Sequence, residues 1–68
     1  MTYRAKEAFM AVRDNPPLPF TFVTIPAGAI IVVAGDVLQS GLVNVLHDGR
    51  IVAAFMRDIE SRADVVSL

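Results

Sequence analysis

The chain contains no cysteine and no tryptophan, a single histidine, and only six basic and seven acidic side chains among its 68 residues. Without cysteine it has neither a disulfide nor a thiolate zinc site, and the lone His47 cannot assemble a metal cluster, so we expect no metal or cofactor. Absence of cysteine fits a reducing compartment. Charges at Arg4, Lys6 and Glu7 stand where an export signal needs an apolar segment, so we expect a cytoplasmic protein.

The chain also lacks a large excess of charge of either sign, because its formal net charge is only −1. Such a chain has no strong attraction for phosphate backbones or anionic lipids. Its longest purely apolar run, residues 29–34, is far shorter than the ~20 residues that span a bilayer. We therefore expect neither nucleic acid nor a membrane as a partner.

Hydrophobic residues are abundant, at 54 % of the chain. A chain of this length forms one small domain, residues 1–68, and buries only about 60 % of the surface that its unfolded form exposes. Domains this small usually depend on disulfides, metals or association, and only association remains here. We expect a homo-oligomer that hides an apolar patch, with a different protein as the alternative partner.

The clearest local signal is Asp48-Gly49, which lies between two apolar runs in LVNVLHDGRIVAAF, residues 42–55. Asp-Gly is preferred in two-residue type I′ hairpin turns, because both residues tolerate a left-handed backbone conformation. This turn role is our interpretation of Asp48, in preference to a His47–Asp48 general base. The turn predicts these cross-strand pairs: Leu42–Phe55, Val43–Ala54, Asn44–Ala53, Val45–Val52, Leu46–Ile51 and His47–Arg50.

This register divides the hairpin into two faces, because side chains alternate along a strand. Both faces are largely apolar, whereas a hairpin with one solvated side alternates apolar and polar residues. We assign the face with the larger residues to the core: Leu42, Asn44, Leu46, Ile51, Ala53 and Phe55. The other face is the candidate interface with a second copy: Val43, Val45, Val52 and Ala54, rimmed by His47 and Arg50.

Glycine, proline and aspartate divide the rest of the chain into short segments, which is typical of an all-β domain. Gly28, after Pro26, is expected to supply a positive φ at a sharp turn. Asp58 is the expected N-cap of a single helical turn. The N-terminal segment is ambiguous between helix and strand, and its alternation favours a strand. The remaining expected elements are strands at 3–12, 20–25 and 29–34, a loop at 37–41, the helical turn at 58–62 and a short strand from residue 64.

Three of the four prolines fall in DNPPLPF, residues 14–20: Pro16, Pro17 and Pro19. Such a run favours polyproline geometry and is a candidate ligand for an aromatic groove. It continues directly into Phe20, Phe22 and Val23, which a small domain needs inside. We therefore interpret it as a structural loop whose prolines lower the entropy of the unfolded chain.

The order of these elements resembles that of Src-homology-3-like barrels, with AKEAF at residues 5–9 and IPAGAIIVV at residues 25–33 at the corresponding places. The resemblance implies an all-β fold, a small five-stranded barrel with one short helical turn near the C-terminus. The signalling members line a peptide groove with several tyrosines and a tryptophan. This chain has one tyrosine and no tryptophan, so proline-peptide binding is not carried over.

The segments VTIPAG, GD and GLVNVLHDGRIV are also similar to the swapped-hairpin DNA-binding domains of antitoxins and transition-state regulators. That family implies an intertwined dimer with a short polar helix between Pro26 and Gly35. Here the intervening AGAIIVVA contains a glycine and β-branched residues, which disfavour a helix.

The sequence favours a binding or assembly module, because no nucleophile, phosphate loop or calcium-loop spacing is recognisable in it. We expect that the chain is not an enzyme. Three alternatives stay open. One is a protein-binding groove with Tyr3, Phe9 or Phe20 at its floor. The others are a DNA-binding dimer and an oligomeric enzyme whose site joins His47, Arg50 or Asp58 from several chains.

Overall fold

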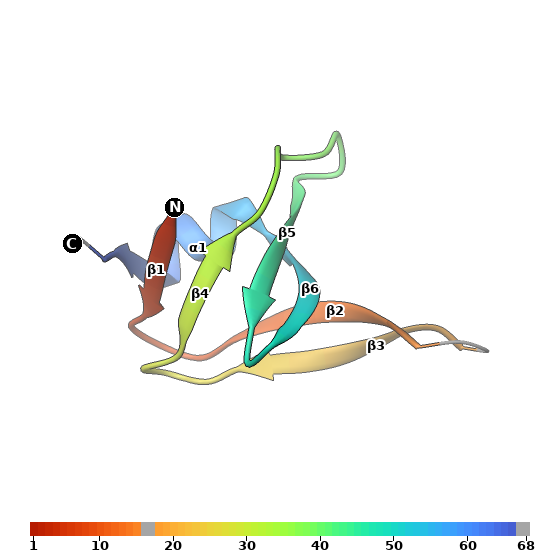
Figure 1. The fold of residues 1–68 in the computed structure, drawn as a ribbon, viewed down its shortest axis with the longest axis horizontal. Coiled ribbons are helices and arrows are strands. Elements are labelled where there is room, and N and C mark those ends of the chain that lie inside the picture. Colours follow the sequence, from red (N-terminus) through yellow and green to blue (C-terminus); the bar gives the residue numbers. More distant parts are fainter. Residues whose placement is uncertain (16–17, 67–68) are drawn as a thin grey trace.

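In the computed structural model, which describes residues 1–15 and 18–66, the strands form one antiparallel sheet (Figure 1). The strand order is β3-β2-β6-β5-β4-β1-β7. The elements are β1 (Thr2–Ala5), β2 (Phe9–Asn15), β3 (Leu18–Ile25), β4 (Ile30–Val33), β5 (Leu42–His47), β6 (Arg50–Phe55), α1 (Met56–Arg62) and β7 (Ala63–Val65).

The prediction of an all-β domain with one short helix is confirmed, whereas five strands was wrong. The described residues form seven strands, and no pairing among them joins the edge strands β3 and β7 into a closed barrel. One extra strand arises because the expected strand 3–12 is interrupted at residues 6–8. There the amides of Lys6 and Glu7 donate to the carbonyl of Arg62, at 2.7 and 3.3 Å, instead of to a neighbouring strand.

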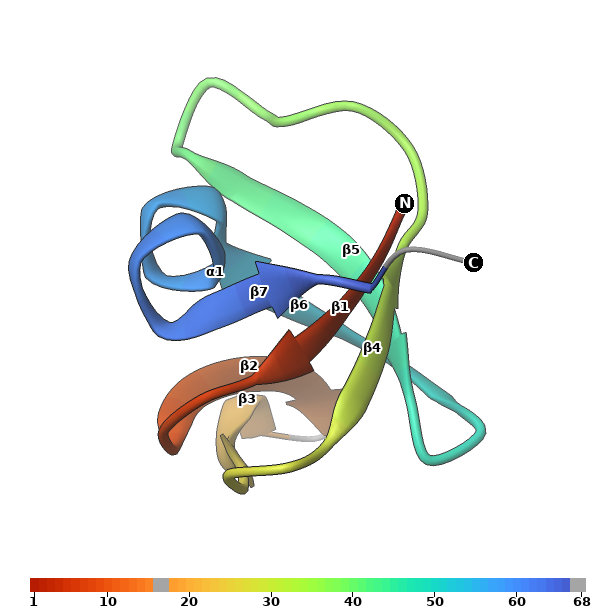
Figure 2. The ribbon, with the colours of Figure 1, turned by 90° about the vertical axis from the view of Figure 1, so that its left-hand side faces the viewer.

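The core lies inside the curl of the sheet, which Figure 2 shows end-on with α1 beside β7. Ile59 of α1 is fully buried there and closes this side of the core. The core side chains are Tyr3, Ala5, Phe9, Ala11, Ile25, Ile31, Val43, Val45, Val52, Ala54, Ile59 and Ala63. They include Tyr3 and Ala5 of β1 and Phe9 and Ala11 of β2, which alternate with more exposed neighbours. Most are small or β-branched, so the interior of this tightly curved sheet is narrow.

All six cross-strand pairs predicted for the β5–β6 hairpin are confirmed. The assignment of its faces was wrong. Val43, Val45, Val52 and Ala54 are 0–3 % exposed and belong to the core. Leu46, Ile51 and Phe55, which were expected inside, are 41 %, 53 % and 42 % exposed. The narrow interior of the curl accommodates the face with valine and alanine and leaves the larger side chains outside.

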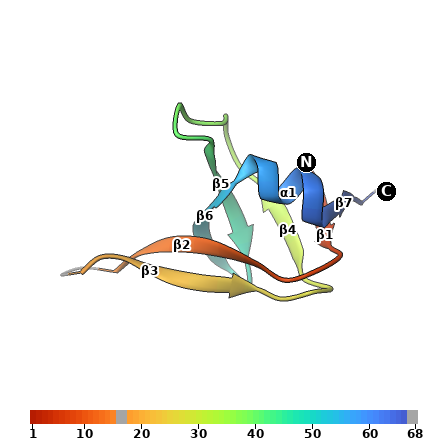
Figure 3. The same ribbon diagram turned by 180° about the vertical axis from the view of Figure 1, so that it is seen from behind.

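Strands β2 and β3 form a hairpin, here called the arm, that projects from the rest of the domain (Figures 1 and 3). Its register runs from Phe9↔Ile25 to Arg13↔Thr21 and, after an irregularity, to Asn15↔Leu18. The expected loop at residues 14–20 was therefore wrong at both ends, because β2 extends to Asn15 and β3 begins at Leu18. Pro16 and Pro17 lie outside the described residues. Pro19 falls within β3, and edge strands tolerate a residue without an N–H.

The turn residues have the conformations that the sequence predicts. Gly28 has φ +90° between β3 and β4, and Asp48 and Gly49 have φ +53° and +76° in the β5–β6 turn. The segment from 26 to 33 consists of this turn and β4, not the helix that the swapped-hairpin resemblance implies.

The tail follows the predicted order of helix and strand, with different boundaries. Helix α1 begins at Met56 instead of Asp58, and Phe55 occupies the N-cap position without a side-chain hydrogen bond. Asp58 lies in the first turn, where its carboxylate is 3.8 Å from the guanidinium of Arg62. Strand β7 then pairs with β1.

Candidate functional site

A large, mainly apolar hollow lies where the arm leaves the domain, between the arm and the outer face of the β5–β6 hairpin. We call it the apolar groove; its volume is about 760 Å³. Its apolar lining comes mainly from Val12, Phe20, Phe22, Leu42, Ile51, Ala53 and Phe55, and Arg13, Asp14 and Asn44 contribute polar atoms. The groove therefore has an arm side and a β5–β6 side.

Strand pairing explains why these side chains meet. Val12 lies opposite Phe22 on one side and opposite Ala53 on the other, and Ala53 lies opposite Asn44. Residues directly opposite one another in an antiparallel pair point to the same face of the sheet. A row of four side chains thus runs continuously from the arm to the hairpin, across the outer face. Figure 1 shows the two hairpins meeting at this point.

Aromatic side chains dominate the exposed part of the groove. Phe20, Phe22 and Phe55 are 48 %, 62 % and 42 % exposed. The rings of Phe20 and Phe22 are 5.3 Å apart in an edge-to-face arrangement at 82°. Phe9 is the only phenylalanine in the core, which contains four alanines instead. Three of the four phenylalanines thus lie around the groove and only one in the core, whereas a monomer is stabilised by burying its large apolar side chains.

The predicted site residues do not gather in the groove. Val43, Val45, Val52 and Ala54 lie in the core, and of these only Val52, at 3 % exposure, touches the groove. Tyr3 and Phe9, proposed for the floor of a peptide groove, are also buried, and only Phe20 of that set lines the apolar groove. Phe22, Ile51 and Phe55 were missed as binding residues. The signal for Ile51 and Phe55 was the apolar character of both faces of the β5–β6 hairpin.

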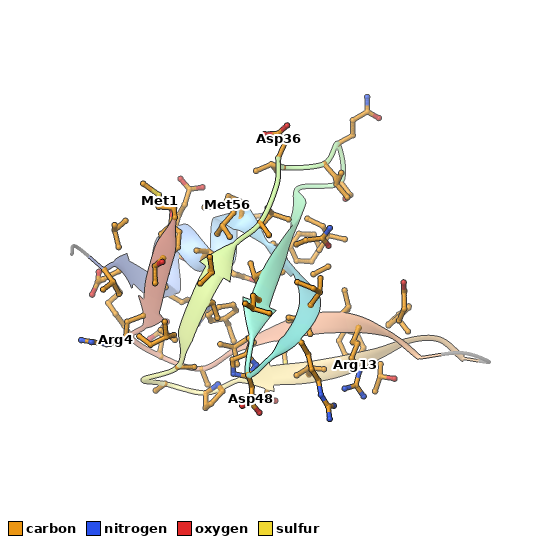
Figure 4. The ribbon with its side chains drawn as sticks, in the orientation of Figure 1. Met1, Arg4, Arg13, Asp36, Asp48 and Met56 are labelled. Carbon is orange, nitrogen blue, oxygen red and sulfur yellow. The ribbon has the colours of Figure 1, made fainter. Side chains whose placement is uncertain are left out.

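The residues proposed for a shared catalytic site lie at opposite ends of β6. His47 and Arg50 flank the Asp48-Gly49 turn, whereas Asp58 is in α1. Figure 4 shows this separation, with Asp48 at the turn and Met56 at the start of α1. Among the described residues, no three histidine or acidic side chains gather in a way that would hold a metal ion. Within one chain, therefore, His47, Arg50 and Asp58 do not come together in one site.

A second hollow, of about 750 Å³, lies between the loop preceding β5 and helix α1. Arg57, Asp58 and Arg62 line it. Arg62 is paired with Glu7 at 2.8 Å and with Asp58 at 3.8 Å, so its charge is largely compensated within the chain. This polar hollow is therefore a weaker candidate than the apolar groove.

The described part of the chain contains no helix that is both long and apolar enough to cross a membrane. No protein-family model, curated protein or solved structure matches the chain. The groove and its chemistry are therefore the basis for a functional proposal.

Proposed function

We propose that this chain is an assembly module that self-associates by burying the apolar groove against a second copy. The observation that carries this proposal is the exposure of Phe20, Phe22 and Phe55 around one groove, above a core built largely from alanine, valine and isoleucine. Contiguous exposed apolar surface usually marks an interaction site. Aromatic residues are enriched at such interfaces.

The shape of the molecule favours a reciprocal contact. Its extents are 38 × 23 × 20 Å, and the arm lies along the longest one (Figure 1). In a two-fold dimer each copy contributes the same patch. The arm of each copy then lies in the groove of the other, so that Phe20 and Phe22 of one copy pack against Ile51 and Phe55 of its partner. Each copy therefore supplies both an arm that inserts and a groove that receives the arm of its partner.

The available area supports a contact between two copies. A phenylalanine side chain offers roughly 200 Å², so Phe20, Phe22 and Phe55 at 48 %, 62 % and 42 % exposure leave about 300 Å² per copy. Two copies contribute about 600 Å² from these rings alone, and a specific interface buries about 1,200 Å² or more in total. Ile51, Leu42 and the polar groove residues supply the remainder.

The test is the solution mass of two matched variants. Ile51→Lys places a charge in the groove, and Ile30→Lys places the same charge on β4, outside it, at a site with 45 % exposure compared with 53 % for Ile51. Sedimentation should show that Ile51→Lys forms a smaller assembly than the wild type, while Ile30→Lys keeps the wild-type mass. Circular dichroism checks that both variants are folded. A folded Ile51→Lys protein with the wild-type mass would refute the proposal.

A further inference from the structure

The outer edge of β3 is the longest unpaired strand edge of the sheet. β3 has eight residues and pairs only with β2 among the described residues, and Figures 1 and 3 show nothing along its other side. Each strand edge carries N–H and C=O groups that seek partners. Because β3 lies at the end of the sheet, one complete set of these groups faces away from the domain.

The two edges of this sheet are built differently. β7, at the other end, has three residues, and its Asp64 is 3.8 Å from the ammonium group of Lys6. Short length and charge are two devices that natural proteins use to prevent edge-to-edge pairing. β3 has neither device, because it is long and contains no charged residue. Its one protective residue is Pro19, near the start of the strand.

We infer that this edge pairs antiparallel with β3 of a second copy, which extends the sheet across a two-fold axis. A neutral strand meets its own copy without opposing like charges. In a register centred on Phe22, Thr21 lies opposite Val23, and Phe20 lies opposite Thr24. These aromatic and β-branched residues are good strand formers, and cross-strand pairs between them stabilise a sheet.

This contact differs from the one proposed above for the groove, although it rests on the same expectation of self-association. The groove contact uses side chains on one face of the arm, whereas the edge contact uses backbone groups along its rim. A subunit with two different two-fold contacts forms a closed assembly of four copies when the axes are perpendicular. The wild type should therefore be heavier than a dimer.

Two substitutions separate the contacts. Thr24→Lys adds a charge to the β3 edge at an exposed residue that is not part of the groove lining, and Ile51→Lys alters the groove without touching β3. Each single variant should sediment as a dimer and the double variant as a monomer. Thr24→Val, which preserves strand propensity without a charge, should keep the wild-type mass. Circular dichroism confirms that each variant is folded.

Amide hydrogen exchange provides an independent signature of strand pairing. Successive N–H groups of a strand point to opposite sides, so the β3 amides that face β2 are protected in a single copy and the alternate ones are not. At high protein concentration the alternate amides should gain protection, and they should lose it on dilution or in Thr24→Lys. Ile51→Lys should retain the protection.

The outcomes distinguish the two proposals. A Thr24→Lys protein with the wild-type mass, or alternate β3 amides that exchange rapidly in the assembled protein, overturns the edge contact. An Ile51→Lys protein with the wild-type mass overturns the groove contact and leaves the edge contact standing. A wild type that is monomeric at every concentration overturns both.

Discussion

Replacing Thr21 by valine should stabilise the protein. Thr21 lies on β3 opposite Arg13, and its hydroxyl oxygen is buried without a hydrogen-bond partner among the described residues. A buried polar group without a partner costs about 1–3 kcal/mol relative to a satisfied one. Valine has nearly the same shape and strand propensity, and its methyl group needs no partner. We expect the free energy of unfolding to rise by about 1 kcal/mol.

This gain is measurable in a chain of 68 residues. For a domain of this size, 1 kcal/mol corresponds to a rise of roughly 4–8 °C in the midpoint of thermal unfolding. Wild type and variant must be compared at the same protein concentration, because self-association also raises apparent stability. Thr24→Val is the matched control. The hydroxyl of Thr24 is exposed and lies 3.6 Å from the Met10 sulfur, so replacing it by a methyl group should leave the midpoint of thermal unfolding almost unchanged. If Thr21→Val melts at or below the wild-type temperature, the hydroxyl is not an energetic cost.

Two further predictions concern the core. Val45→Lys should abolish the folded state instead of only dissociating an oligomer, because Val45 is fully buried and an unpaired buried charge is very costly. A variant that is still folded by circular dichroism would contradict the burial of this hairpin face. Ile59→Ala should lower the free energy of unfolding in urea by about 2–5 kcal/mol, because Ile59 is the fully buried residue of α1; a loss below about 1 kcal/mol would show that α1 contributes little to the core.

Local chemistry made some parts of this fold predictable. The Asp48-Gly49 dipeptide determined the register of six residue pairs, because a two-residue turn fixes the register of the strands that it joins. The positive φ of Gly28 followed in the same way from its place after Pro26. In both cases the information lies within a few residues of the feature.

The choice of buried face depends on the whole sheet. Alternation divides β5 and β6 into two faces, but the curl of all the strands decides which face is inside. Ranking the faces by residue size placed Ile51 and Phe55 in the core. In the structure Val45 and Ala54 are buried inside the curved sheet instead. The candidate groove was therefore not predictable, since it exists only where the arm meets that outer face.

The proline-rich stretch was misinterpreted for a related reason. The prolines predict a loop, yet β2 reaches Asn15 and β3 begins at Leu18. A strand at the edge of a sheet needs only half of its N–H groups for pairing, so it can include Pro19. The sequence does not indicate that β3 is an edge strand. That position follows from sheet topology.

The pairing of β1 with β7 has a consequence for the synthesis of the chain. Tyr3 lies opposite Val65, and the amide of Val66 donates to the carbonyl of Thr2 at 2.8 Å. A ribosome must therefore translate the chain as far as Val65 before β1 acquires this neighbour. Contacts between residues so distant in sequence also slow folding. During translation the phenylalanines of the arm emerge before the sheet can form, and this interval is when the nascent chain is most exposed to association with other chains.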